Sequence, residues 1–150
     1  MWQSLCRETE IAEAGDFFVH DIAGTSVLVL RTASNEIMAY PNACLHRGRQ
    51  LKSSSGSGLG RSRDITCPFH GFSWDLDGNF KGAPCPWDFP HLDHKDFNLP
   101  PLRVDTWGGW VFVNIDGTAP PLTEYLGVMV DHFERWAPEN TYKALHIKKV

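Results

Sequence analysis

The sequence lacks three features that would place it at once in a large class of proteins. No apolar run approaches the roughly 18 residues of a membrane-spanning helix, and the N-terminus has neither the basic start nor the apolar core of a signal peptide. Basic residues are not in excess, because 14 Lys and Arg stand against 18 Asp and Glu, for a net charge of −4. We therefore expect neither a membrane nor a nucleic-acid partner.

Cysteine is also scarce, with four residues in a chain of 150. That length suits one hydrophobic core. Cys6 and Cys85 have unlike surroundings and no evident partner, so both are interpreted as free thiols that behave as small hydrophobes. A reducing, cytoplasmic location fits this pattern best. The other two cysteines, Cys44 and Cys67, each stand close to a histidine.

Two short segments, each with one thiol and one imidazole, carry the chemistry. Zinc modules usually group their ligands as Cys-x-x-Cys and His-x-x-x-His, or use four cysteines. One Cys and one His per segment instead suit a [2Fe–2S] cluster with unlike ends, in which both thiolates take one iron and both imidazoles the other. The predicted cluster and metal ligands are Cys44, His46, Cys67 and His70. A structural zinc site stays open as an alternative.

The pattern of apolar residues predicts a mainly β chain of antiparallel sheets that carry two ligand loops, with one C-terminal helix. The apolar run 27–30 does not alternate, which is typical of a strand buried on both faces. Turn residues predict hairpins at 77–79 and 108–109, and a short helix is expected over 8–13. The expected strands cover residues 17–21, 26–31, 36–40, 64–66, 72–76, 102–106 and 110–115.

Residues 47–63 are rich in Ser and Gly and are predicted to form a mobile surface loop outside the core. Five basic residues and no acidic residue lie in this segment. It is interpreted either as a solvated basic loop or as a docking face for an acidic redox partner. The basic residues are Arg47, Arg49, Lys52, Arg61 and Arg63.

The C-terminal part differs in character. Apolar residues spaced by threes and fours from Leu122 to Trp136 predict one helix that Pro138 ends, and residues 141–150 are expected to form a strand. We therefore divide the chain into a cluster-binding domain, 1–120, and a helix and strand, 121–150, that lead toward a catalytic domain absent from this chain. The remaining histidines, including the pair in His91-Leu92-Asp93-His94, are assigned structural or surface roles.

Taken together, these motifs resemble the N-terminal Rieske domain of the large (alpha) subunit of the Rieske non-haem iron ring-hydroxylating oxygenases. The resemblance covers nearly the whole chain, although the interval between the ligand pairs is a few residues longer than the family usually shows. The segments that carry it, besides 44–48 and 67–72, are 15–17, 27–29, 42–44, 77–78, 99–100, 103–104, 107–114 and 121–127.

The resemblance implies electron transfer through the Rieske cluster to the mononuclear iron of an aromatic ring-hydroxylating dioxygenase, an oxidoreductase. That iron belongs to a second domain in the family, and no segment here matches its ligands, so no catalytic residue is assigned and the chain alone should not oxygenate. The implied partners are a ferredoxin or flavin reductase as electron donor and the catalytic domain of a neighbouring subunit in a homo-oligomer. A free-standing Rieske ferredoxin is the alternative, although such carriers typically lack the tail from Leu122 onward.

The reduction potential follows from the same resemblance. High-potential respiratory Rieske proteins have an extra cysteine in each loop, and Ser and Tyr hydroxyls that donate to the cluster sulfurs. Here these positions hold Arg49 and Phe69, then Phe72 and Trp74. Fewer donors destabilise the more negative, reduced cluster, so we predict a potential near the low end of the Rieske range, about −150 mV. A redox titration at neutral pH checks this, and a midpoint above about +100 mV would indicate the respiratory type.

Overall fold

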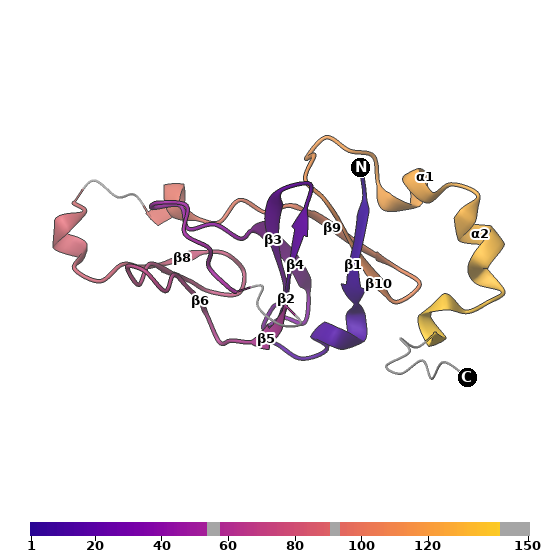
Figure 1. Ribbon diagram of the computed structural model, residues 1–150, viewed down its shortest axis with the longest axis horizontal. Helices are drawn as coiled ribbons and strands as arrows, with labels where there is room; N and C mark the ends of the chain where they lie inside the picture. Colours follow the sequence, from indigo (N-terminus) through magenta and orange to yellow (C-terminus); the bar gives the residue numbers. More distant parts are fainter. Residues whose placement is uncertain (54–57, 91–93, 142–150) are drawn as a thin grey trace, which may run out of the picture.

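A computed structural model describes residues 1–53, 58–90 and 94–141. Three antiparallel sheets follow one another along the long axis of the molecule (Figure 1). Their strand orders are β6-β7-β8, β4-β3-β2-β5 and β1-β10-β9, and two short α-helices lie beyond the third sheet. The fold is therefore mainly β, as the sequence pattern predicted.

Most elements are short. The strands are β1 (Gln3–Arg7), β2 (Asp16–Ile22), β3 (Thr25–Arg31), β4 (Ile37–Pro41), β5 (Leu59–Arg61), β6 (Ile65–Thr66), β7 (Ser73–Trp74), β8 (Phe80–Gly82), β9 (Arg103–Trp107) and β10 (Trp110–Asn114). The helices are α1 (Leu122–Leu126) and α2 (Met129–Glu134), with 3-10 turns η1 (Glu8–Ile11), η2 (Pro86–Asp88), η3 (His94–Phe97) and η4 (Pro138–Asn140).

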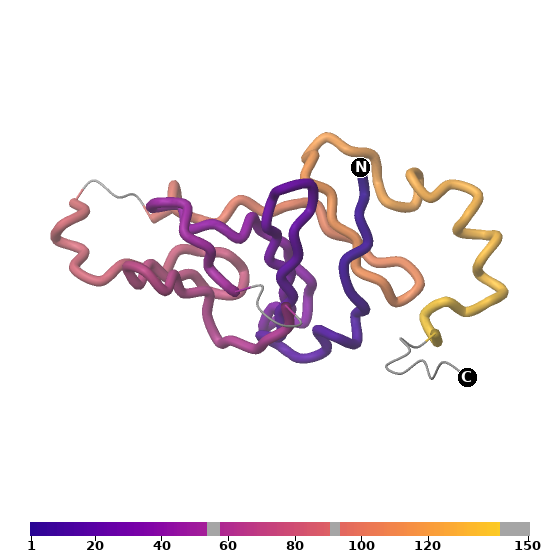
Figure 2. The backbone as a smooth tube through the Cα atoms, in the orientation of Figure 1, coloured from indigo at the N-terminus to yellow at the C-terminus, as the bar shows by residue number. Residues whose placement is uncertain are grey.

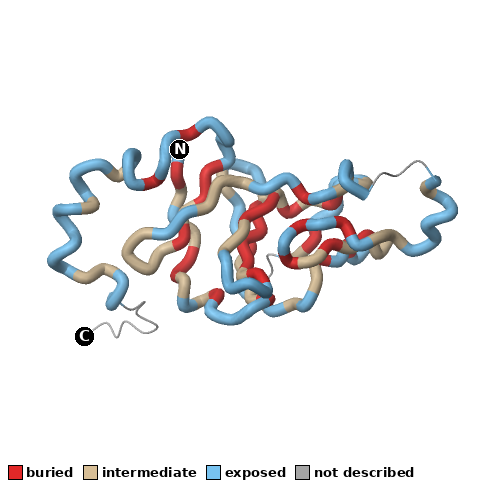
Figure 3. The backbone as a smooth tube through the Cα atoms, turned by 180° about the vertical axis from the view of Figure 1, so that it is seen from behind, coloured by how far each residue is buried: buried red, intermediate tan, exposed pale blue. Residues whose placement is uncertain are grey.

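The middle sheet lies between two hydrophobic cores. Leu28 and Leu30 of β3 pack into the core that also contains the two candidate ligand cysteines. Val27 and Val29, on the opposite face of the same strand, pack against β1 and β10. The buried positions in Figure 3 gather around this sheet and its neighbours. The prediction that β3 is buried on both faces is confirmed.

Both predicted hairpins are present. Trp107 pairs with Trp110 across Gly108 and Gly109, which have φ values of 60° and 75°. The β7–β8 turn uses Gly78 at φ 81°, where an added Cβ would lie 2.7 Å from the Tyr40 ring. Glycine is therefore needed at this turn for two reasons, because the backbone is left-handed and because the turn packs directly on β4.

The predicted mobile loop over residues 47–63 is only partly correct. Residues 54–57 lie outside the described residues, but Leu51 is buried in the core and β5 adds a fourth strand to the middle sheet by pairing with β2. The physical reason is that the free edge of β2 offers backbone groups that β5 satisfies, as when the Val19 N–H donates to the Gly58 carbonyl at 2.9 Å.

Two of the five basic residues in this segment are used within the structure. Arg61 forms an ion pair with Asp16. The Lys52 ammonium donates to Ser62 Oγ at 2.9 Å and lies 5.5 Å from the centre of the Phe17 ring. Burial lowers the pKa of Lys52, and nearby Asp64 partly opposes this shift. Any docking surface in this region must therefore depend on the three remaining basic residues, Arg47, Arg49 and Arg63.

The predicted single C-terminal helix is two helices. Gly127, at φ 54° and ψ −128°, separates α1 from α2, because a residue in this conformation cannot continue the α-helical hydrogen-bond pattern. Its N–H donates to the Thr123 carbonyl and closes α1. Of the strand predicted over 141–150, residues 142–150 lie outside the described residues. No helix in the described part of the chain has the length and apolar character needed to cross a membrane.

A buried arginine fastens the segment after α2 to the third sheet. Arg7 is 4% exposed, and its guanidinium lies 5.0 Å from the centre of the Trp110 ring. Backbone carbonyls satisfy its N–H groups in place of a carboxylate, which is how a buried cation avoids an unpaired desolvation cost. The accepting carbonyls belong to Gly108, Pro138, Glu139 and Thr141.

Candidate metal centre

The two Cys/His segments form loops in the half of the molecule that lies away from α1 and α2 (Figure 2). The first loop follows the end of β4, and the second connects β6 to β7. Each begins at a rigid strand, so the side chains in it are carried by the sheet framework. Their placement agrees with the predicted loop positions.

The first loop is closed by short backbone hydrogen bonds. The Cys44 N–H donates to the Arg49 carbonyl and the Gly48 N–H donates to the Cys44 carbonyl, both at 2.8 Å. Gly48 has a φ of 70°, as a tight turn at this point requires. The loop is thus a compact turn in which the residues between Cys44 and Arg49 are held in one conformation.

Buried Asn42 holds the first loop against the chain that follows it. Its Oδ1 accepts hydrogen bonds from the Leu51 and Lys52 N–H groups at 3.1 and 2.9 Å. Its Nδ2 donates to the Lys52 carbonyl at 2.8 Å and to Ser26 Oγ at 3.2 Å. Sequence reasoning had not given Asn42 this role, because the role depends on residues nine or more positions away.

The second loop has the same design. The Cys67 N–H donates to the Phe72 carbonyl at 2.8 Å, and the Gly71 N–H donates to the Cys67 carbonyl at 3.1 Å. Gly71 has a φ of 71°, and a Cβ there would lie 2.7 Å from the Pro84 ring. The glycines after both histidines are therefore turn residues.

The two loops bring Cys44 and Cys67 together in the core, at 3% and 2% exposure, where each thiol influences the pKa of the other. Burial raises the pKa of the Cys44 thiol, which the His46 N–H only partly offsets. For Cys67, burial is outweighed by the N–H groups of His70 and Phe69 and by the Cys44 thiol, so its pKa is lowered. The pair therefore has backbone donors that favour a thiolate.

The imidazoles of His46 and His70 form a second pair, with ring centroids 5.0 Å apart. Both residues are half-buried. The Nδ1 atom of His46 is buried and has no hydrogen-bond partner, which is unusual for a native polar atom and expected of a metal ligand. Burial first, then His70 and Arg47, lower the pKa of His46, so the ring is held neutral, the form that binds metals.

This like-with-like pairing fits a cluster with two unlike ends. A tetrahedral zinc site would draw all four side chains around one ion. The arrangement therefore favours a [2Fe–2S] cluster over the zinc alternative.

The other histidines and cysteines that the structure describes lie outside this centre. His20 and His132 are exposed on β2 and α2, whereas His91 and His146 lie outside the described residues. Cys6 is buried in the second core, where burial raises its pKa to about 12 and keeps the thiol protonated, as its interpretation as a small hydrophobe implies. Cys85 is instead exposed.

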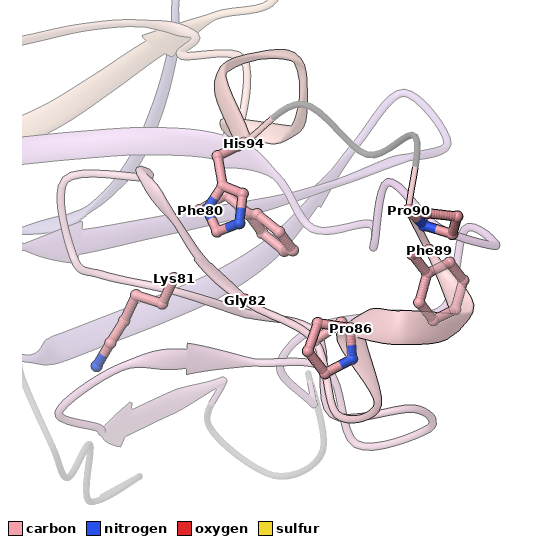
Figure 4. A pocket seen from close by; sticks show the side chains of 8 residues that line it. Phe80, Lys81, Gly82, Pro86, Phe89, Pro90 and His94 are labelled. Atoms are coloured by element: carbon pink, nitrogen blue, oxygen red, sulfur yellow. The ribbon is translucent and has the colours of Figure 1, made fainter.

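A cavity of about 460 Å³ lies next to the centre (Figure 4). Its wall is mainly aromatic and aliphatic, with Lys81 and His94 as the charged or polar side chains. Lys81 is engaged in an ion pair with Asp64 at 2.9 Å. Phe89 belongs both to the cavity wall and to the surroundings of His46, because its ring contacts the imidazole edge-on at 5.8 Å.

Comparison with known proteins identifies a family that matches this chain. The model described as the Rieske [2Fe-2S] domain matches residues 1–97. The chain is 35% identical over 127 residues to the biphenyl 2,3-dioxygenase subunit alpha of Rhodococcus jostii, covering 84% of this chain and 27% of that protein. It is 32% identical over 126 residues to the carnitine monooxygenase oxygenase subunit of Escherichia coli, covering 83% and 33%. The chain thus spans about a quarter to a third of the length of these curated relatives.

Solved structures give the same similarity in three dimensions. The apo form of the quaternary ammonium Rieske monooxygenase CntA superposes with a TM-score of 0.81 at 27% identity, over 89% of this chain and 38% of that chain. Naphthalene 1,2-dioxygenase from Rhodococcus sp. bound to indole superposes with a TM-score of 0.81 at 31% identity, over 89% and 30%. The similarity extends over most of the described fold.

Replacement of Asn42 by alanine tests how far the first loop depends on this side chain. The Leu51 N–H would be left buried without its partner, so we expect a loss of roughly 1–3 kcal/mol in stability and faster loss of bound metal. Asn79→Ala is the matched control, because Asn79 is exposed and its removal should change stability by about 0.5 kcal/mol or less. Denaturant titration at equal metal content measures both, and equal effects would show that Asn42 does not hold the loop.

Proposed function

The chain belongs to the Rieske [2Fe-2S] domain family, and from this premise we propose that it carries electrons to the mononuclear iron of an aromatic ring-hydroxylating oxygenase. The observation that supports this most is the pairing of thiol with thiol and imidazole with imidazole, beside a buried His46 Nδ1 without a partner. The relatives described above are oxygenase subunits, which gives the free-standing ferredoxin alternative no support.

In this proposal Cys44 and Cys67 would hold one iron, and His46 and His70 would hold the other. A bound cluster would supply one-electron redox chemistry. The N–H groups of the ligand loops stabilise the negative charge of the thiolates inside the apolar core. Two neutral imidazoles in place of two thiolates reduce the negative charge of the whole site, so electron uptake becomes easier.

The cysteine end and the histidine end of the centre differ in their exposure to solvent. Both cysteines are buried, whereas both imidazoles are half-buried and reach the surface. We assign the imidazole side to electron entry and exit, because electron transfer requires a short path between partners. The acceptor would be the catalytic domain of a neighbouring subunit in a homo-oligomer, as in the family that the sequence resembles.

The surface around the imidazoles suits an acidic electron donor such as a ferredoxin or a flavin reductase. Leu45 and Phe69 are 40% and 60% exposed. Arg47 and Arg49 lie in the same loop as Leu45, and Arg49 lines a surface hollow together with Phe69 of the second loop. Among the described residues, no carboxylate pairs with either arginine. Exposed apolar side chains next to free guanidinium groups are typical of a protein interface, and the charge would steer an acidic partner.

Metal analysis tests the proposed ligands. We expect two irons and two acid-labile sulfides per chain and a red-brown colour, all lost when Cys44, His46, Cys67 or His70 is replaced by Ala. Cys85→Ala and His20→Ala are matched controls that should keep the cluster, because both side chains are exposed and lie outside the two loops. Zinc in place of iron in protein isolated anaerobically would overturn the proposal.

Charge reversal tests the proposed donor surface. The double variant Arg47→Glu/Arg49→Glu should reduce the rate of electron uptake from a reduced, acidic plant-type ferredoxin by about tenfold or more at low ionic strength. The difference should shrink as salt is added, because exposed charges are screened. Arg135→Glu, at the C-cap of α2 and at the opposite end of the molecule, controls for a charge reversal remote from this surface (Figure 1). Equal rates for the double variant and the wild type in stopped-flow reduction would contradict this surface.

A further inference from the structure

The two imidazoles of the centre have unlike aromatic surroundings. The His46 ring stacks on Phe72, with centroids 4.7 Å apart and planes at 11°, and meets Phe89 edge-on at 5.8 Å and 81°. His70 instead contacts Phe69, at 3.8 Å and 35°, and Phe69 is 60% exposed. One imidazole thus lies against the protein interior and the other beside an exposed side chain.

Phe72 is itself firmly held. Its side chain is 1% exposed, and its carbonyl accepts the Cys67 N–H at 2.8 Å, so the backbone at Phe72 is tied to the second ligand loop. Its ring packs at 39° on Phe80, 5.8 Å away, and at 81° on Phe89, 5.3 Å away. A ring with these contacts cannot rotate or shift without moving its neighbours.

Phe89 contacts both the His46 ring and the Phe72 ring. It follows η2 and is half-buried. Its ring also lines the cavity described above (Figure 4). A rotation of the His46 ring out of its present plane would lose the parallel stacking on Phe72 and collide with or separate from Phe89. The buried, unpartnered Nδ1 of His46 is kept in place by the same contacts.

We propose that Phe72, supported by Phe89, is a positioning residue that fixes the plane of the His46 imidazole, so that Nδ1 keeps one orientation in both oxidation states of the cluster. This inference rests on the proposed function, in which His46 is an iron ligand. Groups that contact a metal ligand from outside commonly fix its orientation, although usually through a hydrogen bond. Here an aromatic face does so, and the first ligand loop is thereby coupled to the second.

The consequence for function is a difference between the two histidines. His46 is a ligand whose geometry changes little when one electron enters or leaves, because its ring is packed on two sides. His70 has a more exposed environment and more freedom to adjust to a partner. Such preorganisation keeps the structural rearrangement that accompanies electron transfer small.

Phe72→Leu tests the inference in the full chain, loaded with its cluster and reduced, by pulsed EPR of protein labelled with ¹⁵N-histidine. We expect one of the two histidine nitrogen couplings to shift and broaden while the other stays as in the wild type. Phe80→Leu is the matched control, because Phe80 is also buried in the same aromatic cluster but has no ring contact with His46. Phe72→Tyr keeps the ring and should restore the wild-type coupling.

Phe89→Leu provides a second test if Phe72→Leu does not fold, since Phe89 is half-buried and removal of its edge contact should alter the same coupling to a smaller extent. Unchanged couplings in cluster-loaded Phe72→Leu would overturn the positioning role. If that variant does not fold, unchanged couplings in Phe89→Leu would overturn it. An equal change in the control Phe80→Leu would also contradict it. Iron and sulfide analysis of the same samples separates the two proposals, because a wild type without a [2Fe–2S] cluster would contradict the proposed function itself.

Discussion

Two thiols that lie side by side in an apolar core impose the main physical constraint on this molecule. A thiolate at Cys44 or Cys67 would be costly to bury without compensation, because desolvation disfavours the charged form. Four backbone N–H groups, two after each cysteine, provide that compensation. The loops must therefore turn tightly enough to direct these groups inward, which explains both the left-handed glycines and the short closing hydrogen bonds.

The sheets provide the rigidity that such loops need. The middle sheet is packed on both faces, with one core around the ligand cysteines and the other against β1 and β10. Asn42 continues β4 into the first loop, and Trp74 of β7 is anchored by an indole hydrogen bond to the Phe97 carbonyl. The Trp74 N–H is therefore already bonded to a carbonyl in the core. This agrees with the prediction that Trp74 does not replace the Tyr hydroxyl that donates to the cluster sulfurs in respiratory Rieske proteins.

The centre is asymmetric in a way that suits electron transfer. Its thiol side is enclosed, while its imidazole side opens toward the exposed side chains of Leu45, Phe69, Arg47 and Arg49. Between these sides, Phe72 links the two loops through its contact with His46. A rigid interior and an adaptable surface are the two properties that a protein needs when it passes electrons between successive partners.

The four candidate ligands, the strands β2, β3 and β4 and both hairpins follow from the sequence by itself, because the spacing of Cys and His, the period of apolar residues and the turn glycines are local properties. Tertiary structure decided the rest. The pairing of β5 with β2, the burial of Leu51 and the internal use of Lys52 depend on partners far away in the chain. So does the stacking of Phe72 on His46, 26 positions apart, since only the folded core brings the two loops together.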